Sequence, residues 1–231
     1  MRGVGHAVIA AAGFGSRLHQ GIPKCLVEVN GHKIIEYQLA LLREVPDVRV
    51  VVGYRGEEVI RAVRELRPDA TCIRNDRFDA TTTLQSYHMG CRDLHDFFIL
   101  LDGDIIPHRS SLRQFLSQFS GESLVGIAPA STEDAVFVHT DGQDRITAFT
   151  RTEPSGWEWS NIAVLHADLL TDDPIYVYQC LERQLPLQAA ALERLEIDTE
   201  ADLRAALEAM GRSREYDLEM EDGRYGGKQH E

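Results

Sequence analysis

The stretch AVIAAAGFGSRLHQGIPKCLVEV (residues 7–29) combines a short apolar run, a glycine-rich turn and two cations. Gly13 and Gly15 let the backbone approach a ligand closely and point bare N–H groups at an anion. The Arg17 guanidinium can grip phosphate oxygens as a fork, and Lys24, which follows a proline, can add a point charge. We therefore expect this loop to bind the phosphates of a nucleoside triphosphate.

Two other phosphate-binding loops do not fit this stretch. A dinucleotide fingerprint, G-x-G-x-x-G, counted from Gly13 needs a sixth-position glycine, but the sequence has Leu18 there. A Walker loop needs Gly-Lys-Ser/Thr, but Gly21 is followed by Ile22. The remaining alternative is an ordinary strand-to-helix turn with two solvated cations. The complete string from Gly13 to Lys24 favours phosphate binding over that alternative.

Acidic side chains follow a later apolar run, LLDGDIIP (residues 100–107). Asp102 and Asp104 are two apart, and such residues project to the same side of an extended chain, so both can face one ion. Mg²⁺ prefers few protein carboxylates, completed by waters and phosphate oxygens. A strand end that merely caps the next helix is the alternative. Because ligands of open parallel sheets collect at the carboxyl ends of the strands, we expect Asp104 to hold Mg²⁺, or Mn²⁺, beside the glycine loop.

A second acidic pair lies far away in the sequence, in LEIDTEADL (residues 195–203). Glu196 and Asp198 close an extended run just before a helix that begins with a threonine cap. On the residues alone, Asp198 can be a second metal ligand or only a helix cap, and both roles stay open.

These groups must be positioned by an α/β sheet. Short apolar runs of strand type alternate with segments of helical period. Strands that are apolar on consecutive positions and joined by helices predict a sheet that is covered on both faces. The predicted fold is a single-domain, Rossmann-like three-layer sandwich with a mostly parallel, mixed central sheet. Strands are expected at 6–11, 48–54, 70–74, 97–104 and 123–130, and helices at 32–44, 56–66, 82–93 and 109–119.

The pattern becomes richer in β-structure after residue 130. Two strands flank an Asp141-Gly142 turn, which is a hairpin signal. A strand at 160–167, a helix at 174–184, extended chain at 187–198 and a capped helix at 199–211 follow. We expect one domain over 1–211, with a nucleotide-binding part at 6–130 and a small β-rich acceptor-binding part at 131–198, and a polar tail at 212–231.

Composition excludes several classes of protein. The 24 Lys and Arg against 37 Asp and Glu give a net charge of −13, which disfavours a nucleic-acid partner. The four cysteines form no C-x-x-C pair, so neither a zinc ribbon nor a disulfide framework is indicated. No apolar run reaches the roughly 18 to 20 residues that span a bilayer. We expect a cytoplasmic protein with reduced thiols, no signal peptide and no membrane partner.

The string A-A-G-x-G-S-R-L…P-K-x-L-V-E-V resembles the signature of nucleotidyltransferases that couple a nucleoside triphosphate to a phosphorylated small molecule. Within that superfamily, the chain is most similar to the short phosphocholine cytidylyltransferase type, over most of residues 6 to 205. The resemblance implies the nucleotide-diphospho-sugar transferase fold, CTP and a small phosphate- or phosphonate-bearing acceptor as substrates, and pyrophosphate as a product. It also implies that Asp198 is the second metal ligand beside Asp104. A homodimer remains open.

The resemblance also implies a set of binding residues. Arg17 and Lys24 are the expected catalytic cations. Thr82 and Thr83 stand where the family has paired asparagines, which leaves the cytosine preference and the choline acceptor open. The expected nucleotide-binding residues are Ala11, Ala12, Gly13, Phe14, Gly15, Ser16, Asn75, Thr82, Thr83, Ser86 and Asp102.

Acceptor-binding residues are expected in the later part of the chain. Tryptophan faces near acids can cage a quaternary ammonium, but core packing is the commoner role of tryptophan. Basic residues in the same region would instead suit a more anionic acceptor. The expected acceptor-binding residues are Arg151, Trp157, Trp159, Asn161 and Glu196.

The chemistry that these groups permit needs no general base. An acceptor phosphate has a second pKa of about 6 and is already an anionic nucleophile at neutral pH. Catalysis then rests on positioning and on stabilising the charge of the departing pyrophosphate. Rival readings are guanylyl-, uridylyl- or thymidylyl transfer to a sugar 1-phosphate or a molybdopterin-like cofactor, a glycosyltransferase of the same fold using the D-x-D at 102–104, and a non-catalytic nucleotide sensor.

Overall fold

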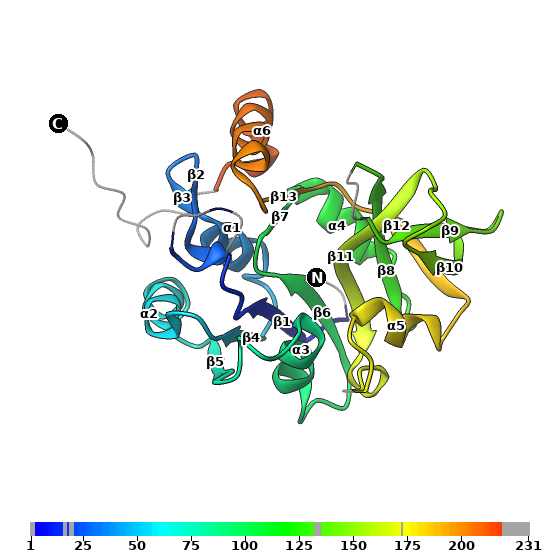
Figure 1. Cartoon of the computed structure of the whole chain (residues 1–231), viewed down its shortest axis with the longest axis horizontal. Helices are drawn as coiled ribbons and strands as arrows, with labels where there is room; N and C mark the ends of the chain where they lie inside the picture. Colours follow the sequence, from blue (N-terminus) through cyan, green and yellow to red (C-terminus); the bar gives the residue numbers. More distant parts are fainter. Residues whose placement is uncertain (1–2, 16–17, 19–20, 132–134, 172, 219–231) are drawn as a thin grey trace.

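The computed structural model describes residues 3–15, 18, 21–131, 135–171 and 173–218, and in these residues one large sheet forms the centre of the molecule (Figure 1). Its strands, in order across the sheet, are β5 (Thr71–Arg74), β4 (Asp47–Val52), β1 (His6–Ala11), β6 (Phe97–Asp102), β11 (Trp157–His166), β8 (Leu124–Pro129), β12 (Leu187–Ala191), β10 (Arg145–Thr150) and β9 (Phe137–Thr140).

The sheet is mixed, as predicted. Strands β5, β4, β1 and β6 run parallel, whereas β11 is antiparallel to both of its neighbours, β6 and β8. Ala10 of β1 pairs with Asp102 of β6, so these two strands end side by side. The glycine-rich loop after β1 and the acidic turn after β6 therefore leave the sheet at the same edge.

Helices cover both faces of the sheet. Side chains alternate between the two faces along each strand, so neighbouring residues pack against different helices. Ile9 and Val50 pack with α1 (Ile34–Leu41), α2 (Gly56–Leu66) and α4 (Arg109–Ser117) on one face. Val8 and Leu100 pack with α3 (Thr83–Cys91) and α5 (Val177–Glu182) on the other. Both faces of the parallel strands are apolar for this reason, and the three-layer arrangement is confirmed.

A third, smaller core joins three segments that are far apart in the sequence. It contains residues of β2 (Glu28–Val29), of α1, of β7 (Ile105–Pro107) and of α6 (Glu200–Arg212). Strand β2 forms a hairpin with β3 (His32–Lys33). Strand β13 (Arg194–Glu196) pairs with β7 and leads into α6. This core brings the C-terminal helix over the N-terminal hairpin, beside each other at the top of Figure 1.

Helix α6 begins as the sequence predicts. Thr199 is its N-cap residue: Thr199 Oγ1 accepts a hydrogen bond from Asp202 N at 3.2 Å, and the Asp202 carboxylate accepts one from Thr199 N at 2.8 Å. Such reciprocal bonds satisfy two of the N–H groups that a helix leaves unpaired at its start.

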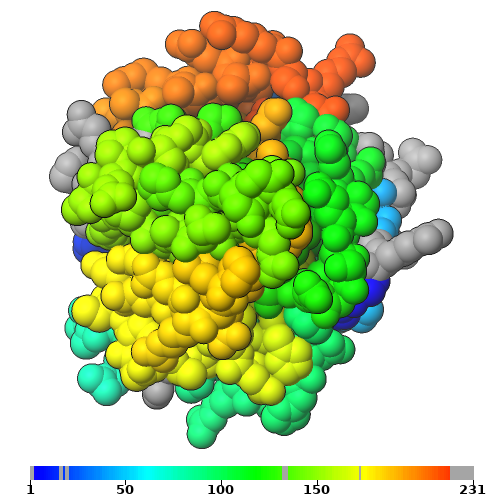
Figure 2. All heavy atoms as spheres, turned by 90° about the vertical axis from the view of Figure 1, so that its right-hand side faces the viewer, coloured from blue at the N-terminus to red at the C-terminus, as the bar shows by residue number. Residues whose placement is uncertain are grey.

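The predicted hairpin around Asp141 is also present, between β9 and β10. Asp141 Oδ1 accepts hydrogen bonds from Gln143 N and Arg145 N and closes the turn. Figure 2 shows the face on which the yellow-green and yellow segments of this half of the chain form one continuous surface. No helix in the described ranges is long and apolar enough to cross a membrane.

Some element ends differ from the sequence prediction. The helix expected over 32–44 spans only Ile34–Leu41, because Asn30 and Gly31, both with positive φ, form the turn of the β2–β3 hairpin just before it. Asn-Gly is a strong hairpin signal. The helix expected over 174–184 is shortened to Val177–Glu182. Of the predicted tail, residues 214–216 form a short 3₁₀ turn (η4), in which the Tyr216 ring lies 5.4 Å from the ring of His108.

Candidate active site

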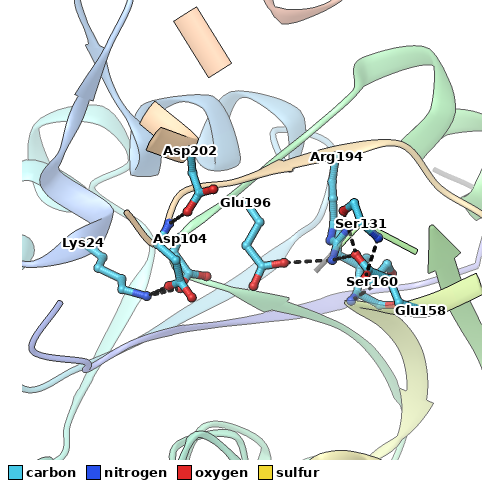
Figure 3. A network of polar contacts seen from close by, with 10 residues as sticks. Lys24, Asp104, Ser131, Glu158, Ser160, Arg194, Glu196 and Asp202 are labelled. Atoms are coloured by element: carbon cyan, nitrogen blue, oxygen red, sulfur yellow. Dashed lines mark hydrogen bonds and ion pairs between the residues drawn. The ribbon is translucent and has the colours of Figure 1, made fainter. Parts of the chain in front are cut away.

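The side chains of Lys24, Asp104 and Asp198 converge at the carboxyl edge of the sheet. The Lys24 Nζ atom donates a hydrogen bond to Asp104 Oδ2 at 2.8 Å and a second, short one to Asp198 Oδ1. The three side chains are only 18–21% exposed. Figure 3 shows the side chain of Lys24 extending from its own segment to Asp104. One ammonium is thus shared by two carboxylates from distant parts of the chain.

The charge state of Lys24 is fixed by this arrangement. Burial alone lowers the pKa of the ammonium, but its hydrogen bonds and ion pairs with Asp104 and Asp198 outweigh burial and raise the pKa to about 12. Lys24 is therefore a permanent cation at neutral pH. It can attract an anion but cannot serve as a general base.

The segment η2 (Lys24–Leu26) positions the lysine. Pro23 precedes it in an extended conformation, and Cys25 and Leu26 are buried in the core that α1 also forms. Gly15 of the glycine-rich loop lies next to Lys24 and has a φ of +64°. A Cβ atom on Gly15 would stand 2.8 Å from Lys24 Cγ, so a larger residue would displace the lysine side chain.

The rest of the predicted loop is placed as follows. Ala11 and Ala12 are buried at the end of β1, whereas Gly13 and Phe14 are exposed. The Phe14 ring packs against Tyr54, with centroids 4.3 Å apart. Ser16 and Arg17 lie outside the described residues.

The acidic turn corrects one expectation. Asp102 and Asp104 were expected to project to the same side of an extended chain, but β6 ends at Asp102, and Gly103 and Asp104 form a turn. Gly103 N donates to Ala10 O at 3.0 Å, and a Cβ atom at Gly103 would lie 2.8 Å from the same oxygen. Consequently Asp104 reaches Lys24, whereas Asp102 Oδ1 accepts a hydrogen bond of 2.6 Å from the hydroxyl of Tyr87.

The surroundings of Asp102 strongly raise the pKa of its carboxyl group. Burial, followed by the charge of Asp104, raises the pKa of Asp102 to about 8, although the hydrogen bond from Tyr87 acts in the opposite direction. Its carboxyl group is therefore protonated more readily than a solvated aspartate. A cation that enters this part of the site favours the ionised form, because opposite charges stabilise each other.

Asp198 is held at the junction between β13 and α6. Ile197 N donates to Asp104 O at 3.0 Å, which fastens the two acidic segments to each other. Asp198 N donates to Asp202 Oδ2 at 3.1 Å. Because Thr199 is the N-cap residue, the side chain of Asp198 is not used as the cap and points to Lys24.

The residues expected to contact the nucleotide base are partly internal. Asn75 and Ser86 are 1% and 4% exposed, and Asn75 Nδ2 donates to Ser86 Oγ at 3.2 Å and to Thr81 Oγ1 at 2.8 Å. These bonds shape the loop between β5 and α3. Thr82 is the N-cap residue of α3: its side chain faces the backbone of Gln85 in a capping box, and Thr82 N donates to Gln85 Oε1 at 2.9 Å. Thr83 is exposed.

A buried polar network lies beside the acidic cluster (Figure 3). Arg194 Nη2 donates to Glu196 Oε2 at 2.8 Å and to Glu158 Oε1 at 3.2 Å, and Glu158 also accepts from Ser131 N at 3.1 Å. The side chains of Glu158 and Arg194 are 2% and 7% exposed. Burial raises the pKa of Glu196 to about 7, against the lowering effect of Arg194. Glu196 lies between this network and Asp104.

The other residues expected to bind the acceptor are spread out. Trp159 is 7% exposed and packs in the sheet core, against which the half-buried Trp157 also packs. Asn161 has φ +57° in an irregular part of β11. Arg151 is exposed, and its guanidinium lies 4.6 Å above the ring of Tyr176. Within the described residues, Arg151 contacts the rings of Tyr176 and Tyr178 and not the Lys24 cluster.

The two aspartates fit a divalent cation that takes most of its ligands elsewhere. Mg²⁺ commonly binds through one or two carboxylates and completes its octahedron with waters and substrate phosphates. Among the residues that the structure describes, no group of three or more His, Cys, Asp or Glu side chains is arranged to hold a metal ion. Asp104 and Asp198 therefore suit a cation delivered with a polyphosphate better than a permanent structural metal.

Several residues that shape the site were missed in the sequence: Gln38, Tyr87, Asp202, Arg194 and, as a network member, Ser131. Spacing along the chain says nothing about contacts between segments. Two of them did leave a signal. Asp202 is the fourth residue of a capping pattern that starts at Thr199, and Gln38 is a polar residue on the buried face of an apolar helix, IIEYQLAL.

Comparison with known proteins connects this geometry to a family. A family model described as the MobA-like NTP transferase domain matches residues 7–213. A choline-phosphate cytidylyltransferase from Streptococcus pneumoniae is 44% identical over 117 residues, which are 48% of this chain and 50% of that protein. A CTP:phosphoglutamine cytidylyltransferase from Campylobacter jejuni is 32% identical over 87 residues, 36% of this chain and 34% of that protein. The matches thus span half or less of these relatives.

Solved structures share the fold over most of the chain. The CTP:phosphocholine cytidylyltransferase of Streptococcus pneumoniae aligns with a TM-score of 0.71 and 22% identity, covering 89% of this chain and 98% of that one. The inositol-1-phosphate CTP transferase of T. maritima aligns with a TM-score of 0.72 and 18% identity, covering 90% and 96%. The fold is therefore the single-domain α/β nucleotide-diphospho-sugar transferase fold, as the sequence predicts.

Proposed function

We propose that this chain, which belongs to the family of MobA-like NTP transferase domains, is a Mg²⁺-dependent cytidylyltransferase. In this proposal it condenses CTP with a small acceptor that bears a phosphate or a phosphonate, and it releases pyrophosphate. The observation that carries the proposal is the Lys24 ammonium held between Asp104 and Asp198. A fixed cation beside two carboxylates suits a polyphosphate with a divalent cation, because each charge of the substrate then meets its opposite.

The preference for CTP is supported by the similarity to two relatives that are both cytidylyltransferases. It is also compatible with the segment between β5 and α3, where the exposed Thr83 begins α3. The threonines at 82 and 83 remain a departure from the paired asparagines of the phosphocholine type, so the base is a point that the experiment below must test.

The reaction that fits the site is an in-line displacement. An oxygen of the acceptor phosphate attacks the α-phosphorus of CTP, the bond between the α-phosphorus and the bridging oxygen breaks, and pyrophosphate leaves with the electron pair. When bound, Mg²⁺ supplies positive charge to the triphosphate and its leaving group. Lys24 binds and orients the phosphates as a permanent cation. Asp104 and Asp198 would bind the Mg²⁺ ion, and no residue has to remove a proton.

The acceptor is proposed to lie on the Glu196 side of the site. Glu196 is partly exposed and lies near Asp104, and Arg194 fixes its carboxylate. In this proposal the Arg194 network fixes the carboxylate of Glu196 on the side where the acceptor binds.

Pyrophosphate release tests this function directly. We would incubate the protein with Mg²⁺, each of the four ribonucleoside triphosphates or thymidine triphosphate, and phosphocholine, phosphonates or sugar 1-phosphates in turn. We expect pyrophosphate only when CTP and an acceptor are both present. Lys24→Ala is the negative control: it removes the ammonium that Asp104 and Asp198 share, so it should release much less pyrophosphate. If pyrophosphate is released only with a triphosphate other than CTP, the base preference would be reassigned. If CTP binds tightly but no acceptor supports turnover, catalysis would be contradicted.

A further inference from the structure

Gln38 is a fully buried polar residue in α1 that forms hydrogen bonds with the acidic turn, Asp102–Ile105. It is 0% exposed, and its Nε2 atom donates hydrogen bonds of 2.7 Å to Asp102 O and to Ile105 O. These two carbonyl groups stand on either side of Gly103 and Asp104. One amide therefore spans the turn from which Asp104 reaches Lys24.

The orientation of the Gln38 amide follows from its partners. Both Asp102 O and Ile105 O are acceptors, so the nitrogen and not the oxygen must face them. Gln38 Oε1 is buried and has no hydrogen-bond partner among the described residues. A buried amide oxygen without a partner costs free energy. An apolar side chain would avoid this cost, so what the amide contributes here is its pair of bonds to the turn.

Helix α1 also supports the segment that carries Lys24. Cys25 and Leu26 pack in the same core as Ile35 and Leu39 of α1. Ile34 N, at the start of the helix, donates to Val27 O at 3.1 Å, just after that segment. The same helix therefore contacts the lysine segment through packing and the acidic turn through Gln38.

The third member of the cluster is fastened to the same turn. Ile197 N donates to Asp104 O at 3.0 Å and so places Asp198 relative to Asp104. The backbone oxygens of residues 102, 104 and 105 are thus bound by Gln38 or by Ile197. A shift of the turn would move Asp104 away from both Lys24 and Asp198.

We propose that Gln38 is a positioning residue for the divalent cation: it holds the Asp102–Ile105 turn so that Asp104 and Asp198 bind one cation together. This inference rests on the proposed function, because it assumes that the cation arrives with the triphosphate. Groups behind metal ligands commonly change metal affinity or activity by about 10- to 100-fold when they are removed.

The test compares Gln38→Met with Tyr37→Phe. Methionine keeps the length of the side chain but donates no hydrogen bond. Tyr37 is the neighbouring residue in α1, is 3% exposed, and donates one buried bond of 2.7 Å to Val29 O, away from the acidic turn. The two variants therefore lose buried hydrogen bonds from the same helix, and only one of them touches the turn.

Two quantities are measured for each protein: Mn²⁺ binding in the presence of CTP by titration calorimetry, and the Mg²⁺ dependence of pyrophosphate release. We expect Gln38→Met to weaken Mn²⁺ binding and to raise the half-saturating Mg²⁺ concentration by about 10-fold or more. Its kcat at saturating Mg²⁺ should stay within about threefold of wild type, since the reacting groups are still present. Tyr37→Phe should leave both metal readings unchanged, even if its Tm falls.

Each outcome is decisive. Wild-type Mn²⁺ affinity in Gln38→Met, or an equal loss in Tyr37→Phe, would overturn the role of Gln38 and leave the proposed function standing. If the wild-type protein neither binds Mn²⁺ with CTP nor releases pyrophosphate, the proposed function fails and the inference fails with it. If Gln38→Met does not fold, Gln38→Asn replaces it, because its shorter amide cannot span both carbonyl groups, and an unchanged metal affinity there would also overturn the inference.

Discussion

Gly15 and Lys24 are packed so closely that a single carbon atom added to Gly15 would stand 2.8 Å from Lys24 Cγ. The glycine has φ +64°, and the lysine it touches is the cation shared by Asp104 and Asp198. The glycine-rich loop therefore fixes the position of the Lys24 side chain.

Gly15→Ala should impair catalysis by displacing Lys24. Gly21→Ala is the matched control, because Gly21 also has φ +64° but no atom lies within 4 Å of an added Cβ. Both variants carry a backbone strain of about 1 kcal/mol. Gly15→Ala should lose more stability than Gly21→Ala in urea denaturation, because it also displaces Lys24 from Asp104 and Asp198. Only Gly15→Ala should also lose kcat/KM for CTP, by about 10-fold or more. Equal kinetic losses in the two variants would show that backbone strain, not the contact with Lys24, is responsible.

Lys24→Ala should reduce turnover by about 10² to 10³, the range found when one group that stabilises transition-state charge is removed. Without CTP or metal, the variant loses the ammonium between Asp104 and Asp198, and repulsion between these carboxylates should lower its Tm. Added Mg²⁺ should therefore raise the Tm of the variant more than that of the wild type, as thermal unfolding can show. A folded variant with full activity would exclude Lys24 from the reaction.

Asp202→Ala should affect both stability and activity. It removes the acceptor of the Asp198 N, Thr199 N and Thr199 Oγ1 hydrogen bonds. Loss of a helix cap of this kind costs about 1–2 kcal/mol in the free energy of unfolding, and the loosened Asp198 should also weaken the response to Mg²⁺. Glu200 is exposed and lies two residues before Asp202. Glu200→Ala should lose less than about 0.5 kcal/mol and keep its Mg²⁺ dependence. If both variants respond alike to Mg²⁺, Asp202 acts only on the helix.

Most of the fold could be predicted because its causes are local. The apolar runs at 6–11 and 97–102 are buried on both faces, and the cap at Thr199 is read from four consecutive residues. Errors occurred where a local signal was overlooked, as at Asn30-Gly31, or where a turn interrupted an apparent strand, as at Gly103. There the approach of the Ala10 carbonyl, a contact between distant segments, decides the conformation.

The site was predictable in part for the same reason. The residue types of Lys24 and Asp104 predict phosphate and metal binding, and Asp198 was added through the family resemblance. The structure brings the three side chains together, and their roles stay predictions. Contacts made across the sheet, such as those of Gln38 and Tyr87 with the acidic turn, depend on which helix packs behind which strand. Asn75 and Ser86 were expected at the nucleotide, and the structure shows them bonded to each other inside the protein.

The buried cysteines should make the protein less stable at alkaline pH. Burial raises the pKa of Cys25 from its usual 9.0 to about 12. In the pH range from 9 to about 12 the unfolded chain therefore releases this proton while the folded protein keeps it, so the stabilisation that is complete below pH 9 is lost as pH rises. Each such group changes the free energy of unfolding by up to about 1.4 kcal/mol per pH unit.

Urea denaturation at several pH values between 8 and 11 measures this effect. Cys25→Ala should lose less stability than the wild type over that range, so the difference between the two curves should change with pH. Parallel curves would mean that the thiol of Cys25 ionises as easily in the folded protein as in the unfolded chain.

The central claim is that one divalent cation and one triphosphate meet where Lys24, Asp104 and Asp198 converge. A crystal structure with CTP and Mn²⁺, in which anomalous scattering locates the metal, tests it most directly. We expect the metal within about 2.0–2.3 Å of a carboxylate oxygen from each aspartate and of a phosphate oxygen, with Lys24 Nζ about 3 Å from another phosphate oxygen. A metal bound elsewhere, or a triphosphate that does not contact Lys24, would contradict it.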